Sequence, residues 1–114
     1  MNTTSPAQAP GLPLAGLRVL DMSHVIAGPL ASFYLLQMGA EVIKVESPLG
    51  GDVMRAGKVQ REGEMPEGFV SLNAGKRSRA VDIRQAEGAE LVRRLAATAD
   101  VFIENFRPGV VARH

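Results

Sequence analysis

The chain has 114 residues and a formal net charge of +1, with 46% hydrophobic and 22% charged residues. These proportions are typical of a globular domain, and they exclude a disordered protein, which needs low hydrophobicity and high net charge. The balanced charge and an aromatic content of 4% also argue against nucleic-acid binding, which needs a basic surface and stacking side chains. The chain has no cysteine, so disulfides and thiolate metal sites are excluded.

The first thirteen residues predict a flexible leader. Pro6, Pro10 and Pro13 favour an extended chain, and residues 1–13 hold neither the basic segment nor the apolar run of a targeting peptide. No apolar run in the sequence approaches the roughly 20 residues that are needed to span a membrane. We therefore expect a cytoplasmic protein that has no membrane partner.

Residues 17–46 predict a βαβ unit. The apolar run 17–20 ends at Asp21 and is typical of a buried strand. A loop over 23–27 then leads to a helix that starts around Gly28-Pro29 and ends at Gly39. This helix is apolar on nearly all sides, so we expect both of its faces to be covered. The β-branched residues of 41–46 predict a second strand, parallel to the first.

The alternation of elements resumes after a long interruption. Residues 47–73 are rich in Gly and Pro and predict turns, including a tight turn at 50–52. Further along, the patterns predict a strand over 79–83, an amphipathic helix over 85–99, and a strand over 101–104 whose following turn enters a last helix. Such alternation favours an open α/β sheet, whose ligands lie beyond the carboxyl ends of the strands.

The residues at these strand ends do not by themselves identify a function. His24 is more often a structural residue than a catalyst, and its distance in sequence from His114 does not suggest a metal pair. The basic residues between Lys76 and Arg84 fit a phosphate-facing edge as well as a solvated surface. No generic nucleotide-binding or catalytic motif occurs.

Four segments in order carry a resemblance to a known family. They read GLRVLDMSHVIAGP (16–29), GAEVIKVESPLGGDVMR (39–55), NAGKRSRAVDI (73–83) and ADVFIENFRPGV (99–110). Together they resemble the N-terminal part of the class III CoA-transferases, a superfamily that includes formyl-CoA transferase, carnitine CoA-transferase and the α-methylacyl-CoA racemases. The resemblance runs from about Leu14 to the last residue.

The resemblance implies a fold and an assembly. It implies a Rossmann-like α/β domain over residues 14–114, with an open, mainly parallel sheet and flanking helices, that binds coenzyme A. It also implies that this domain is the front part of a longer protein, which forms an interlocked homodimer.

The resemblance also implies which residues contact CoA. Carried over by position, the contacts fall at Ile26, Ala27, Ser47, Val81, Asp82, Ile83, Arg84, Asn105, Phe106, Arg107 and Arg113. Among them, Arg84 and Arg113 suit the nucleotide phosphates. Relatives with formyl-CoA transferase activity place Gln where Ile26 stands and Arg where Ser47 stands. The missing Gln argues against that particular substrate, and the missing Arg implies weaker nucleotide binding.

The chemistry of the family implies a transfer of CoA between an acyl-CoA thioester and a carboxylic acid, through an aspartyl-acyl anhydride. The nucleophilic Asp of the family lies downstream of the matched segment, and none of Asp21, Asp52, Asp82 and Asp100 takes its place. We therefore expect no catalytic residue in this chain, no turnover from it alone, and no metal. The alternatives are a fragment like α-methylacyl-CoA racemase and a non-catalytic remnant that binds CoA or a nucleotide.

Overall fold

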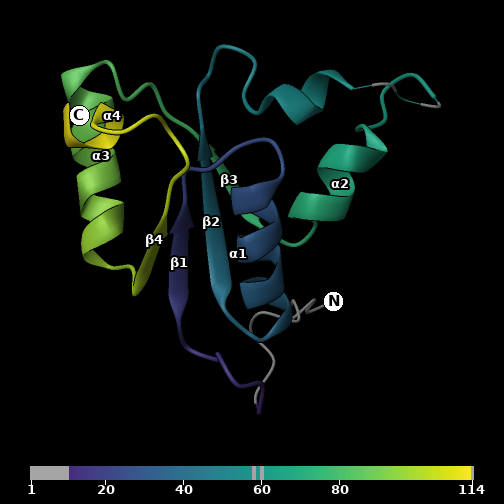
Figure 1. The fold of residues 1–114 in the computed structure, drawn as a ribbon, viewed down its shortest axis with the longest axis horizontal. Coiled ribbons are helices and arrows are strands. Elements are labelled where there is room, and N and C mark those ends of the chain that lie inside the picture. The colour runs from purple at the N-terminus through teal and green to yellow at the C-terminus, as the bar shows by residue number, and fades with distance from the viewer. Residues whose placement is uncertain (1–10, 58, 60, 114) are drawn as a thin grey trace.

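The computed structural model, which describes residues 11–57, 59 and 61–113, has a four-stranded parallel sheet at its centre (Figure 1). The strands follow the order β3-β2-β1-β4 across the sheet, so β1 and β2 are central. Their bounds are β1 (Arg18–Asp21), β2 (Glu41–Glu46), β3 (Arg77–Ala80) and β4 (Val101–Ile103). The expected α/β class with an open parallel sheet is confirmed.

Two longer helices cover the two faces of this sheet. These are α1 (Ala27–Gln37), between β1 and β2, and α3 (Ala86–Ala97), between β3 and β4. Successive side chains of a strand point to opposite faces. Accordingly, Val19 and Val42 pack with Leu36 of α1, while Leu20 and Ile43 belong to the core that includes Val92 of α3. The two apolar cores fix the sheet between its helices.

The predicted βαβ unit is confirmed, with one correction. Helix α1 begins at Ala27, two residues before Pro29, and within the part of the chain that the structure describes it contacts β1, β2 and α2. Leu36 is buried, whereas Tyr34 is 54% exposed and Met38, just after the helix, is 41% exposed. These outer residues are exposed within the described part of the chain, so the cover expected for this face stays a prediction.

The segment 47–73 is more ordered than its Gly and Pro content predicts. It holds a 3₁₀ helix, η2 (Val53–Ala56), and a short helix, α2 (Glu67–Asn73). Asp52 caps η2, because its side chain accepts a hydrogen bond from the Met54 N–H. The fourth α-helix, α4 (Val110–Arg113), is also short; it ends the described chain and follows the turn predicted at 105–109.

Strand β3 lies two residues earlier than predicted. The expected strand covered 79–83, but the paired residues are Arg77–Ala80, all exposed at the edge of the sheet. The apolar residues that suggested the later position, Val81 and Ile83, pack instead with the core beneath α3. The predictions of the amphipathic helix and of the last strand are confirmed by α3 and β4.

The predicted leader falls mainly on residues 1–10, outside the described residues. Leu14 already packs against the core on the α1 face, and its backbone N–H donates to the carbonyl of Met38 at 2.7 Å. Across residues 11–57, 59 and 61–113, none of the helices is long and apolar enough to cross a membrane.

Candidate functional site

The carboxyl ends of the four parallel strands meet at one edge of the sheet, the upper edge in Figure 1. A pocket of about 410 Å³ opens at this edge. Residues at or after the ends of the strands line it: Met22, Ser23, His24, Val45, Glu46, Ser47, Gly51, Asp52, Val53, Val81, Asp82, Ile83, Arg84, Phe106 and Val110. This is where the ligands of open α/β sheets lie.

The pocket gathers part of the sequence-predicted set. The predicted residues in its lining are Ser47, Val81, Asp82, Ile83, Arg84 and Phe106. The lining does not include Ile26, Ala27, Asn105 or Arg107. Ile26 is 53% exposed just before α1, which begins at Ala27. Arg113 ends α4, and its side chain lies outside what the structure describes.

Arg84 is held at the pocket by its neighbour Asp82. The Asp82 carboxylate accepts hydrogen bonds from Nε and Nη2 of Arg84, at 3.0 and 3.2 Å, and from its backbone N–H at 3.0 Å. These bonds lower the pKa of Asp82 and raise that of Arg84. A guanidinium has five N–H donors, so Arg84 is oriented by Asp82 and keeps donors for an anion.

His24 and Phe106 lie side by side in the lining, with their ring centroids 5.4 Å apart and the rings tilted by 45°. The amide of Asn105 joins the two segments. Its Oδ1 accepts from the His24 N–H at 3.2 Å and its Nδ2 donates to the His24 carbonyl at 2.8 Å. Asn105 therefore binds the loop after β1 rather than facing the pocket.

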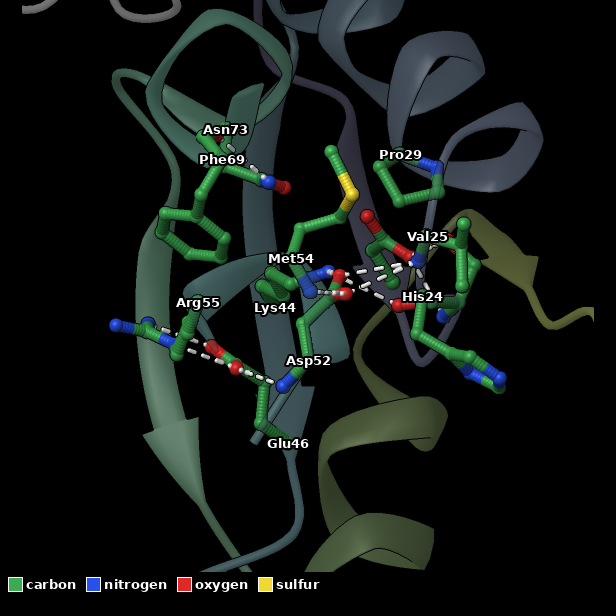
Figure 2. A network of polar contacts seen from close by, with 12 residues as sticks. His24, Val25, Pro29, Lys44, Glu46, Asp52, Met54, Arg55, Phe69 and Asn73 are labelled. Carbon is green, nitrogen blue, oxygen red and sulfur yellow. Dashed lines mark hydrogen bonds and ion pairs between the residues drawn. The ribbon is translucent and has the colours of Figure 1, made fainter. Parts of the chain in front are cut away.

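Asp52, one of the lining residues, is buried at the pocket and connects three parts of the chain (Figure 2). Its carboxylate accepts from the Val25 N–H at 3.1 and 3.2 Å and from the Met54 N–H at 3.0 Å. It also pairs with Nζ of Lys44 at 3.1 Å. Burial by itself would raise the pKa of Asp52, but these hydrogen bonds and the Lys44 charge outweigh it and hold the pKa below its ordinary value.

Glu46, at the end of β2, is a second buried carboxylate of this kind. It accepts two hydrogen bonds from Arg55, both of 2.7 Å, and a third from the Asp52 N–H at 2.7 Å. Burial opposes ionisation here too, but the bonds from Arg55 and Asp52 keep the pKa of Glu46 below its ordinary value.

Asp21 is the third buried carboxylate, and it corrects one sequence expectation. It accepts from the hydroxyls of Ser23 and Ser32 and pairs with Nζ of Lys76 at 3.1 Å. The hydroxyl bonds and the Lys76 charge outweigh burial and lower the pKa of Asp21. Lys76, with a side chain only 2% exposed, faces this carboxylate and not a phosphate edge. Burial lowers its pKa.

The charged groups below the pocket were missed from the sequence. The turn predicted at 50–52 is present, with positive φ at Gly50 and Gly51. The hydrogen bond between the Val25 N–H and the Asp52 carboxylate, however, joins residues 27 positions apart in the sequence. One signal was available. Lys44 interrupts the apolar run of β2, and a lysine in a buried parallel strand needs a charged partner.

The arrangement suits binding more than covalent chemistry. Val45, Val53, Ile83 and Phe106 give the pocket apolar walls, and Arg84 supplies an oriented cation. Such a site fits a ligand that carries both a flat apolar ring system and an anionic group. Within the described residues, no group of three or more His, Asp or Glu is placed to hold a metal ion.

Comparisons with known proteins agree on one family. The sequence pattern of CoA-transferase family III matches residues 14–114. The chain is 41% identical to the succinyl-CoA–L-malate CoA-transferase alpha subunit of Chloroflexus aurantiacus, over 95% of this chain and 27% of that protein. It is 43% identical to the succinyl-CoA:glutarate CoA-transferase of Homo sapiens, over 85% of this chain and 22% of that protein.

A solved structure gives the same result for the fold. The crystal structure of a CAIB/BAIF family protein from Brucella suis superposes with a TM-score of 0.83 and 46% identity, over 90% of this chain and 28% of that one. The chain thus spans about a quarter of the length of the relatives that it matches. With a pattern that matches from residue 14 to residue 114 and a shared fold, the chain belongs to CoA-transferase family III.

Proposed function

We propose that residues 14–114 form the CoA-binding domain of a family III CoA-transferase, with the nucleotide half of CoA in the pocket at the carboxyl edge of the sheet. One observation carries the proposal: residues from separate segments that the family resemblance marks as CoA contacts line a single pocket around Arg84. Phe106 and the aliphatic side chains offer surface to a base, and Arg84 offers N–H donors to a phosphate.

The predicted CoA contacts outside the pocket lining lie close in sequence to residues that line it. Ile26 and Ala27 follow the loop that is tied to Asn105, next to the pocket residue His24. Arg107 comes directly after the pocket residue Phe106. These residues, and Arg113 farther along the chain, are proposed to contact the parts of CoA that extend beyond the pocket.

The proposed reaction passes CoA from an acyl-CoA thioester to a carboxylic acid, through an anhydride on an Asp that this chain does not supply. The four Asp carboxylates of this chain support this part of the proposal, because each of them is already engaged by other groups of the chain. Asp21 and Asp52 are buried in hydrogen bonds, Asp82 holds Arg84, and Asp100 accepts from the Arg18 N–H at 2.9 Å. The complete enzyme is proposed to be a homodimer without a catalytic metal. The names of the two relatives above favour transfer over the racemase-like alternative.

Calorimetric titration of the chain with CoA tests the proposal. Arg84→Ala removes charge-assisted hydrogen bonds worth about 1.5–3 kcal/mol, so CoA affinity should fall roughly 10- to 100-fold. Arg94→Ala is the matched control, because it removes the same charge from an exposed helix position outside the pocket. Equal affinities of the two variants would contradict the proposed pocket. If this chain alone catalysed steady-state CoA exchange, the proposal that it lacks the nucleophilic Asp would be contradicted.

A further inference from the structure

Side chains from distant segments hold the loop between β1 and α1. The Ser23 N–H donates to Asp21 at 2.8 Å, and the Ser23 carbonyl accepts from Nζ of Lys44 at 2.9 Å. The Asn105 amide forms hydrogen bonds with both the N–H and the carbonyl of His24, and the Asp52 carboxylate accepts a hydrogen bond from the N–H of Val25. Each backbone N–H and C=O from the Ser23 N–H to the Val25 N–H is therefore fixed by a side chain.

Val25 is the strained residue of this loop. Its φ of 72° is the only positive φ of a non-glycine residue in the part of the chain that the structure describes. A β-branched residue adopts this left-handed conformation only where its surroundings enforce it. Burial of the side chain in the core does not enforce it here, since Val25 is 37% exposed. The hydrogen bond from its N–H to Asp52 is the restraint that acts on Val25 itself.

Asp52 is rigid enough to act as this restraint. Its side chain is fully buried and paired with Lys44, and its own N–H donates to Glu46, which Arg55 holds in turn. Figure 2 shows this chain of contacts from Arg55 through Glu46 and Asp52 to Val25. The next residues after Val25 are Ile26 and Ala27, both exposed and both predicted CoA contacts.

We propose that Asp52 is a positioning residue for CoA: its carboxylate is engaged by Val25, Met54 and Lys44, and it acts on the ligand by holding Val25 in the left-handed conformation. This fixes the shape of the loop 24–27 that the ligand meets. This inference rests on the proposed function and extends it, because it names a residue that affects CoA binding through the loop.

The size of the effect follows from the population of the loop. When only a fraction of the molecules has the competent loop, the apparent dissociation constant rises by the inverse of that fraction. If the loop keeps the strained conformation for about one tenth of the time without Asp52, affinity falls about tenfold. Glycine adopts positive φ without strain, so Val25→Gly should restore part of the lost affinity.

The test is a cycle of Asp52→Ala, Val25→Gly and the double variant. CoA affinity is measured by calorimetry, and the exchange rate of the Val25 amide by NMR. Asp52→Ala should weaken CoA binding about tenfold and speed the exchange of the Val25 amide, and the added Val25→Gly should recover affinity several-fold. Asp52→Asn keeps the side-chain shape and one acceptor oxygen, so its CoA affinity should lie between those of wild type and Asp52→Ala. It replaces Asp52→Ala in the test if the alanine variant does not fold.

Val42→Ala is the control for lost stability. It removes a buried side chain on the α1 face of the sheet, from a core cluster that includes no residue of the loop 23–27, so it should leave CoA affinity unchanged. An Asp52 variant that binds CoA as well as this control, or a double variant without recovery, would overturn the positioning role. If the wild-type chain binds no CoA, the proposed function fails. The Val25 exchange rates then decide the positioning role separately, since equal rates with and without Asp52 would overturn it.

Discussion

Gly28 shows how closely the loop and the helix approach each other at the level of single atoms. It is the second residue of α1, and a Cβ built on it would overlap the side chain of Ser23. Ser23 cannot turn aside, because both its N–H and its hydroxyl are bonded to the buried Asp21. A hydrogen atom is therefore the only side chain that this position accepts without movement of the loop.

We expect Gly28→Ala to destabilise the fold by about 1–3 kcal/mol through overpacking. Helix propensity alone predicts the opposite sign, because alanine is favoured over glycine by about 1 kcal/mol. Gly68→Ala in α2 is the control, since its Cβ would meet only the flexible end of the Met54 side chain. Urea unfolding measures both variants. A Gly28→Ala chain as stable as wild type would show that the loop moves freely.

At the scale of elements, Arg55 joins three of them. It belongs to η2, its guanidinium makes two hydrogen bonds to Glu46 of β2, and it lies 4.1 Å above the ring centroid of Phe69 in α2. Both η2 and α2 are too short to be stable alone. Their attachment to the rest of the fold therefore depends on tertiary contacts, among them those of Arg55, more than on local helix propensity.

Arg55→Lys tests this attachment. Lysine keeps the charge but loses the planar pair of hydrogen bonds and the stacking over Phe69, so we expect a stability loss of about 1–2 kcal/mol. Amides of η2 and α2 should exchange faster, while those of β1 change less. Arg94→Lys, in an exposed pair with Glu90, should alter neither quantity. Equal loosening of β1 and α2 would contradict a local role for Arg55.

The contrast between α3 and α2 explains what could be predicted from the sequence. The amphipathic pattern of α3 is local, and so are the apolar runs of β1 and β2, so these elements were found. Helices η2 and α2 depend on Arg55 and on the cap from Asp52, which no periodic pattern reveals. The predicted position of β3 was wrong because the apolar pattern marks the residues that pack into the core, not those that pair in the sheet. An edge strand needs only backbone partners.

The same division holds for the candidate site. Strand ends and the family resemblance pointed to the edge where the pocket lies and to its residues Ser47, Arg84 and Phe106. Asp52 was interpreted only as part of a turn, because its partners Val25 and Lys44 come from other segments. Apart from the lysine within the apolar run of β2, tertiary contacts of this kind leave no local signal in one sequence.

Buried negative charge is concentrated under one edge of the sheet. Asp21, Glu46 and Asp52 are each at most 8% exposed. Each has a pKa below its ordinary value, because hydrogen bonds and neighbouring cations outweigh the effect of burial. The folded state therefore binds protons at these groups less readily than the unfolded chain does.

This charge distribution predicts acid sensitivity. A lowered folded-state pKa contributes stability that is fully present above the unfolded pKa, here 3.8 for Asp and 4.5 for Glu, and is lost as the pH falls through the folded values. We expect the free energy of unfolding to fall steeply below about pH 4.5. Urea titrations between pH 6 and pH 3 measure it, and Asp52→Asn should flatten the decline. A stability independent of pH over this range would contradict the prediction.

The wholly parallel sheet also decides the order in which the fold can assemble. None of its strands is joined to a partner by a hairpin, and the contact between Arg18 and Asp100, where β1 meets β4, spans 82 positions. Pairing of β1 with β2 closes a much shorter loop, so the βαβ unit should form first and β4 should dock late. Interactions made late stabilise the native state more than the folding transition state. Strand β4 thus determines how long the folded molecule lasts more than how fast it forms.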